Sequence, residues 1–226
     1  MNSGILGTGM VGRAIAAKMV ELGHDVMLGT RDVDALNART EPDGMGNPPF
    51  SVWHKDNQQV KVGEFAEAAA HGEMLFNCTN GMASLDALKQ AGAANLNGKV
   101  LIDIANPLDF SQGMPPSLSV SNTDSLGEQI QRAFPQVNVV KTLNTLNANL
   151  MVDPKQLAAG DHTIFVSGND TDAKVQVTTL LQQFGWQDII DLGDITTARG
   201  TEMLLPIWIR LMGALQTPMF NFKIVR

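Results

Sequence analysis

The residues with the clearest chemical potential form a glycine-rich turn near the start of the chain. A short apolar run ends at Gly7, and Gly7-Thr8-Gly9-Met10-Val11-Gly12 leads directly into a helical pattern. In a G-x-G-x-x-G turn the first glycine permits a tight turn and the second lets the backbone approach a pyrophosphate. The third glycine, here Gly12, lets the helix pack closely against the strand, and the positive end of that helix faces the phosphates. This position between a strand and a helix predicts a dinucleotide site.

The end of the second predicted strand indicates which dinucleotide would bind there. An Asp or Glu at that point accepts hydrogen bonds from the ribose of NAD, whereas hydroxyl and cationic groups hold the 2′-phosphate of NADP. The chain reads Gly29-Thr30-Arg31-Asp32. Thr30 and Arg31 can form charge-assisted hydrogen bonds to a phosphate. Asp32 could accept a hydrogen bond from the ribose instead only if the strand ended two residues later. Thr30 and Arg31 therefore predict NADP.

Other catalytic chemistry has few candidate residues. The chain contains no tyrosine, which excludes reductases that protonate a carbonyl with a Tyr–Lys pair. Cys78 has no histidine near it in sequence to activate it, and Asn106 and Lys141 come without a partner that would tune either as an acid. No metal-ligand spacing is present. The four histidines occupy positions typical of solvated or capping side chains: His24, His54, His71 and His162.

Without an evident proton relay, the sequence favours hydride transfer between two stacked planar rings. One ring would be a nicotinamide and the other a flavin-like heterocycle, so the cofactors would carry the chemistry and the protein would position them. We therefore assign no catalytic side chain and no metal ligand.

Strand-like and helix-like patterns alternate along the 226 residues, which predicts an α/β fold with a doubly wound, Rossmann-type parallel sheet. We expect a dinucleotide-binding domain over residues 1–145 and a small C-terminal helical or αβ extension over 146–226 that completes the cleft. The expected strands cover 3–6, 25–28, 60–62, 73–77, 99–104, 137–143, 162–167 and 188–192. The expected helices cover 10–22, 33–38, 64–70, 84–91, 125–134 and 173–184. Long loops are expected over 39–57 and 113–122.

The C-terminal stretch over 196–215 is apolar nearly all round. It is shorter than a membrane span and carries Pro206 and Arg210, which predicts a buried helix instead. Such a helix must be covered by the sheet or by a second subunit, and a homodimer is expected on this ground.

Composition and charge narrow the classes of partner and compartment. The net charge of −7 argues against a nucleic-acid partner. A single cysteine fits a reducing compartment. The first residues carry no basic segment, so we expect no signal peptide and a cytoplasmic protein.

Several segments together carry a resemblance to a known family. They are 7–12, Gly29-Thr30-Arg31, Asp103-Ile104-Ala105-Asn106-Pro107, Val140-Lys141-Thr142-Leu143-Asn144-Thr145, and matches between Thr197 and Ile224. With them, the chain resembles the coenzyme F420-dependent NADP oxidoreductases, in particular their bacterial branch of small dinucleotide-binding reductases. The resemblance implies an N-terminal dinucleotide-binding domain and hydride transfer between NADPH and the deazaflavin F420 in either direction.

The resemblance also implies roles for individual residues at the strand ends. Thr8, Gly9, Met10 and Val11 would wrap the pyrophosphate, and Thr30 with Arg31 would hold the 2′-phosphate. The residues implied elsewhere are Cys78 and Thr79 beside the adenosine, Ala105, Asn106 and Pro107 at the nicotinamide end, and Asn144, Thr145 and Ala148 beneath the ring.

Three points of the assignment stay open at this stage. Members that reduce F420 often carry His where this chain has Asn144, so a free flavin, a quinone or a ferric chelate is an alternative acceptor. A non-catalytic NADP-binding redox sensor is the alternative from a different class. The Pro-rich loop over 41–50 is expected to be a plain surface loop, with a cap over the cleft as the alternative.

Overall fold

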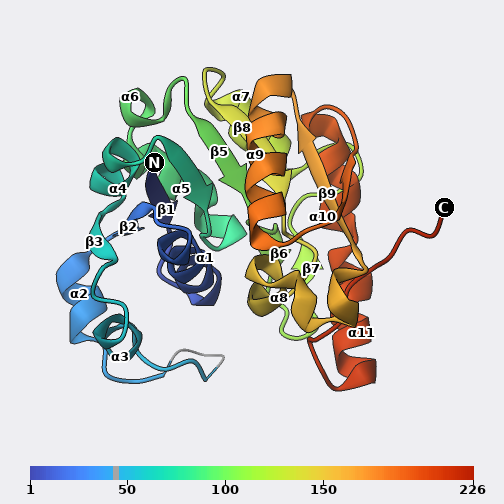
Figure 1. Cartoon of the computed structure of the whole chain (residues 1–226), viewed down its shortest axis with the longest axis horizontal. Coiled ribbons are helices and arrows are strands. Elements are labelled where there is room, and N and C mark those ends of the chain that lie inside the picture. The colour runs from blue at the N-terminus through green and yellow to red at the C-terminus, as the bar shows by residue number, and fades with distance from the viewer. Residues whose placement is uncertain (43–45) are drawn as a thin grey trace.

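An eight-stranded sheet lies at the centre of the protein in the order β10-β9-β8-β5-β4-β1-β2-β3. The computed structural model in Figure 1 describes residues 1–42 and 46–226. The strands of the sheet are β1 (Asn2–Leu6), β2 (Asp25–Thr30), β3 (Lys61–Glu64), β4 (Met74–Asn77), β5 (Val100–Asp103), β8 (Asn138–Thr142), β9 (Thr163–Gly168) and β10 (Asp188–Asp191). A separate antiparallel pair joins β6 (Leu108–Asp109) to β7 (Ser117–Leu118), the latter inside the segment expected to be loop.

The strands that carry the predicted site are parallel and in register at their carboxyl ends. Leu6 of β1 pairs with Gly29 of β2 and with Asn77 of β4, and Asn77 pairs with Asp103 of β5. The predicted α/β fold is therefore confirmed. One pair departs from it, because β9 runs antiparallel to β8. Because β9 begins at the end of the sheet where β8 finishes, the connection between the two strands does not cross the sheet.

Helices cover both faces of the sheet, as alternating core residues require. Ile5, Phe76 and Ile102 belong to one apolar core, whereas their neighbours Leu6 and Leu75 belong to the other. The period of two along a strand sends successive side chains to opposite faces. The helices are α1 (Met10–Glu21), α2 (Val33–Ala38), α3 (Phe50–Lys55), α4 (Phe65–His71), α5 (Gly81–Ala91), α6 (Ala93–Leu96), α7 (Leu126–Ala133), α8 (Ala148–Val152), α9 (Thr171–Phe184), α10 (Ala198–Met203) and α11 (Leu205–Leu215).

The segment expected to be a long loop over 39–57 contains α3. Phe50, the first residue of that helix, is only 1% exposed and belongs to the same apolar core as Ile15 and Met19 of α1. The Arg13 guanidinium lies 5.5 Å from the Phe50 ring, and its Nη1 donates to the Pro48 carbonyl at 2.7 Å. The expectation of a plain surface loop over 41–50 therefore fails at Phe50, while residues 43–45 lie outside the described part of the chain.

The prediction of a single helix over 196–215 is wrong. The segment divides into a 3-10 turn (Ile195–Thr197), α10 and α11, and Pro206 lies in the first turn of α11, where its missing N–H costs nothing. Within α11 only Leu205 is buried, and Ile207 is 48% exposed. Figure 1 shows α11 at the edge of the molecule, away from the sheet. Among the described helices, none has the length and apolar character to cross a membrane.

Candidate functional site

A pocket of about 550 Å³ lies at the carboxyl ends of β1, β2 and β4. In a parallel sheet this edge is where ligands bind. The far wall of the pocket comes from α5, through Ala83 and Ala87 among others. Of the residues predicted to bind the cofactor, the pocket gathers Gly7, Thr8, Gly9, Thr30, Arg31, Cys78 and Thr79.

The three glycines of the turn have different surroundings. A Cβ on Gly7, whose φ is +117°, would lie 2.6 Å from the Cys78 carbonyl oxygen, and one on Gly12 would lie 2.0 Å from the Gly7 carbonyl oxygen. A Cβ on Gly9 would meet no described atom within 4 Å. Gly7 and Gly12 are therefore needed by the fold, whereas Gly9 leaves open space in front of the backbone. A pyrophosphate fits such a cradle, because no side chain separates it from the backbone.

The end of β2 has the arrangement that favours a phosphate. The strand ends at Thr30, so the condition for Asp32 to act as the ribose acceptor is not met. Asp32 instead caps α2, because its Oδ1 accepts from the Ala35 N–H at 2.8 Å. Arg31 is exposed beside it and lines the pocket.

The loop after β4 forms the wall of the pocket opposite the end of β2. The Thr79 hydroxyl donates to Asn77 Oδ1 at 2.6 Å, and Asn77 Nδ2 donates to Asp103 Oδ1 at 2.8 Å. Burial, with a smaller contribution from the Asp103 charge, raises the pKa of the Cys78 thiol far above its ordinary value. The thiol therefore stays protonated, which makes it a poor nucleophile.

The loops after β5 and β8 are joined by two amide side chains. Asn106 Nδ2 donates to the Asn144 carbonyl at 2.8 Å, and Asn144 Nδ2 donates to Asn106 Oδ1 at 3.0 Å. Leu143, directly after β8, has a φ of +61°, a strained conformation for a leucine. The structure thus holds the two loops together, although their residues do not line the 550 Å³ pocket. Four of the other predicted residues here are buried: Ala105, Pro107, Thr145 and Ala148.

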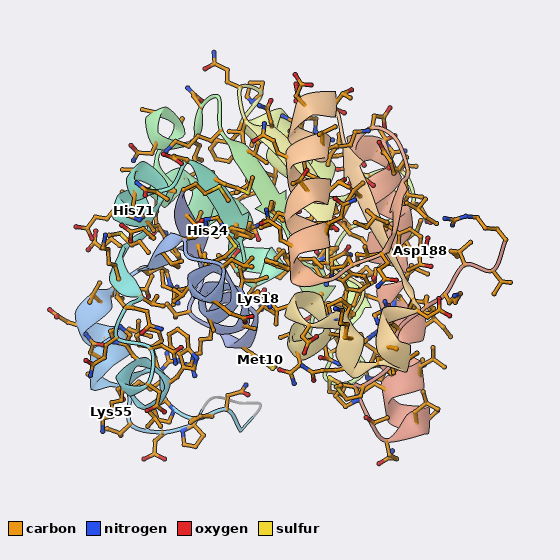
Figure 2. All side chains as sticks on the ribbon, in the orientation of Figure 1. Met10, Lys18, His24, Lys55, His71 and Asp188 are labelled. Atoms are coloured by element: carbon orange, nitrogen blue, oxygen red, sulfur yellow. The ribbon has the colours of Figure 1, made fainter. Side chains whose placement is uncertain are left out.

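The remaining predicted residues lie on α1 outside that pocket. Met10 is 41% exposed at the N-terminal end of the helix, where Figure 2 shows it facing α8. Val11 is half-buried and Gly12 is buried. Helix α1 packs against α8. Met10 and Val11 therefore lie between the glycine turn and the loop that follows β8.

A buried ionic network beneath these loops was not expected from the sequence. Lys141 Nζ lies 2.9 Å from Asp103 Oδ2 and 2.8 Å from Glu202 Oε1. Burial alone would lower the pKa of Lys141, but Asp103 and Glu202 outweigh it and hold the pKa above its ordinary value. The statement that Lys141 lacks a partner is therefore wrong. Asp103, the last residue of β5, pairs in register with Lys141 near the end of the adjacent strand β8, and that pairing was the available signal.

Glu202 links this network to the C-terminal segment. Its two carboxylate oxygens accept from the backbone N–H groups of Leu126, at 2.8 Å, and Gly127, at 3.1 Å. These N–H groups begin α7, and a carboxylate there is stabilised by the helix dipole. Lys141 also donates to the Ala105 carbonyl at 2.5 Å. The network therefore ties the loop after β5 to α10.

The histidines lie away from the pocket. His24 and His71 stand at the end of the sheet opposite Met10, as Figure 2 shows, and His54 lies 2.8 Å from the Val60 carbonyl oxygen. The expectation of a solvated or capping His162 is wrong: it is 2% exposed, packs edge-on against Trp186, and has Nε2 2.9 Å from the Pro154 carbonyl oxygen. In the part of the chain that the structure describes, no group of three or more His, Cys, Asp or Glu could hold a metal ion.

Comparison with known proteins agrees with this geometry. The family described as NADP oxidoreductase, coenzyme F420-dependent, matches residues 2–107. A crystal structure from Arthrobacter sp. FB24, named as a candidate F420-dependent NADP-reductase, is 61% identical, covers 100% of both chains and has a TM-score of 0.97. The chain belongs to the F420-dependent NADP oxidoreductase family. It is an NADP-dependent oxidoreductase of that family.

More distant relatives cover most of the chain. The F420-dependent NADP reductase of Methanothermobacter marburgensis is 26% identical over 91% of this chain and 89% of its own length. The metalloreductase STEAP3 of Rattus norvegicus is 27% identical over 91% of this chain, which spans only 37% of that protein. A reductive aminase of Aspergillus terreus, in complex with NADPH and ethyl levulinate, is 16% identical with a TM-score of 0.63 over 94% of this chain and 62% of that one, and this likeness shows the fold alone.

Proposed function

We propose that the chain transfers a hydride between the nicotinamide of NADP(H) and a stacked deazaflavin, coenzyme F420, or a related flavin-type acceptor. The observation that carries the proposal is the pocket itself. At one end Gly9 leaves open space before the backbone, and at the other Thr30 and Arg31 line the end of β2. The family to which the chain belongs supports the same cofactor and acceptor.

In this proposal the residues of the turn and of β2 bind the phosphates. Thr8 and Gly9, with Met10 and Val11 at the start of α1, would hold the pyrophosphate through backbone N–H groups at the positive end of the helix. Thr30 and Arg31 would hold the 2′-phosphate. Cys78 and Thr79 would border the adenosine.

The loops after β5 and β8 would receive the nicotinamide end, with Ala105, Asn106 and Pro107 on one side and Asn144, Thr145 and Ala148 beneath the ring. The nicotinamide, when bound, supplies or accepts the hydride. The Asn106–Asn144 amide pair keeps the two loops at one spacing, so the binding surface is already organised before the acceptor arrives. Thr145 Oγ1 is buried beneath these loops and has no hydrogen-bond partner among the described residues.

The acceptor is the part of the proposal that an activity measurement tests. Purified protein is mixed with NADPH and, separately, with F420, FMN, FAD, quinones and ferric chelates, and NADPH absorbance is followed. Turnover with F420 is the expected result. Turnover with ferric chelates alone would favour a second candidate, a metal reductase, which the similarity to STEAP3 supports. Tight NADP binding without turnover with any acceptor would favour the redox sensor.

We also propose a cytoplasmic homodimer in which residues 1–145 bind the dinucleotide and residues 146–226 complete the cleft and form the dimer interface. The uncovered apolar side chains of α11 support the interface, because Ile207 and Leu215 are 48% and 53% exposed. Exposed apolar surface of this kind is typical of contacts between proteins. A mass in solution near twice 24.3 kDa is expected, and a monomer at micromolar concentration would contradict the interface.

A further inference from the structure

The wall of the pocket beyond Arg31 is formed by one face of α2. Asp32, Ala35, Leu36 and Arg39 all line the pocket. Their spacing of three and four residues places them on the same side of a helix. Arg39 is the first residue after α2, with an extended backbone (φ −71°, ψ 121°), and lies four residues beyond Ala35. Because the Ala35 side chain is only a methyl group, it leaves room for the Arg39 side chain to face the pocket.

Arg39 and Arg31 are unlike many of the other basic residues of this protein. Lys61, Lys174 and Arg226, for example, are each paired with an aspartate at 2.6–2.8 Å. Arg31 and Arg39 are exposed, and neither forms a hydrogen bond or ion pair with any residue in 1–42 or 46–226. In a chain of net charge −7, two unpaired guanidinium groups at one pocket indicate a site for a strongly charged anion.

The 2′-phosphate of NADP is an anion of this kind. A phosphate monoester carries close to two negative charges near neutral pH, so Arg31 alone does not neutralise it. The Asp32 carboxylate beside Arg31 adds a further negative charge on the same wall. A second guanidinium would restore the balance and add a planar pair of donors for the phosphate oxygens.

We propose that Arg39 is the second cationic ligand of the 2′-phosphate and, with Arg31, sets the preference for NADP over NAD. This inference rests on the proposed binding of NADP in the 550 Å³ pocket. Arg39 also borders a smaller hollow of about 70 Å³ that includes Thr8 and Gly9. Arg39 therefore borders both the proposed 2′-phosphate site at Thr30 and Arg31 and the turn at Thr8 and Gly9 that would hold the pyrophosphate. The experiment must distinguish binding of Arg39 to the 2′-phosphate from binding to the pyrophosphate.

The test measures dissociation constants by calorimetry for NADP⁺, NAD⁺, 2′,5′-ADP and 5′-ADP. For Arg39→Ala we expect the affinities for NADP⁺ and 2′,5′-ADP to fall about tenfold, and those for NAD⁺ and 5′-ADP to change less than twofold. Arg39→Lys should recover part of the loss. Lys55→Ala is the matched control: it removes one exposed positive charge from α3, outside the pocket (Figure 2), and should change none of the four constants.

Each other outcome has a definite meaning. Equal losses for all four ligands would assign Arg39 to the pyrophosphate and overturn the inference. Unchanged NADP⁺ binding in Arg39→Ala, with loss in Arg31→Ala, would also overturn it but leave the proposed function standing. Wild-type protein that fails to bind NADP⁺ would instead contradict the proposed function.

Discussion

Replacing Lys141 with Met should lower the free energy of unfolding by about 3–5 kcal/mol. Lys141 is completely buried between Asp103 and Glu202, at 2.9 and 2.8 Å. Removing one partner of a buried ion pair leaves uncompensated buried charge, which accounts for a loss of this size. The measurement is urea unfolding of the wild type and the variant, followed by circular dichroism.

Two further variants make the Lys141 result specific. Lys89→Met removes a lysine whose partner Asp86 is 3.1 Å away on the surface, and it should cost about 0–1 kcal/mol. Adding Asp103→Asn to Lys141→Met should restore part of the stability, because the buried carboxylate that faced Lys141 is then neutral, while its other oxygen still accepts from Asn77. A Lys141→Met protein as stable as the Lys89→Met protein would show that the network does not hold the site loops.

Substitution of two glycines in the turn should separate folding from cofactor binding. Gly12→Ala places a Cβ 2.0 Å from the Gly7 carbonyl oxygen, so the strand and α1 must move apart. Overpacking of this kind costs about 1–3 kcal/mol, and occasionally more. The melting temperature should therefore fall.

Gly9→Ala should behave in the opposite way. Its Cβ meets no described atom, and its φ of −74° is accessible to alanine, so the cost to the fold should be about 1 kcal/mol or less, from the weaker helix cap. The methyl group projects into the space assigned to the pyrophosphate. Affinity for both NADP⁺ and NAD⁺ should therefore fall at least about tenfold, or ~1.4 kcal/mol. Normal dinucleotide binding by Gly9→Ala would place the pyrophosphate elsewhere.

Local patterns were sufficient to predict most of the sheet and one half of the candidate site. The apolar period along each strand, together with the glycine turn, predicted the α/β order, and β2 ends at the Thr30 that the cofactor argument singled out. These signals depend only on residues close together in the chain. They required no knowledge of which strands are neighbours.

Features that depend on tertiary packing were missed. Lys141 and Glu202 are separated by 61 residues of chain, so nothing in the sequence near Lys141 indicates the carboxylate from α10. Similarly, the nearly uniform apolar character of 196–215 predicts a covered helix, yet only Leu205 of α11 is buried and Trp208 is covered by the Phe220 ring of the C-terminal segment. Helix α3 was missed because Pro48 and Pro49 favour a loop, although a proline can directly precede a helix and here Pro49 caps α3.

The most direct test of the account compares NADP⁺ and NAD⁺ binding to the wild type and to Arg31→Ala. The account predicts that Arg31→Ala weakens NADP⁺ binding by about 1.5–3 kcal/mol, the range for a hydrogen bond to a charged group, and barely changes NAD⁺ binding. Equal losses for the two dinucleotides, or none for either, would contradict the assignment of the 2′-phosphate to the end of β2.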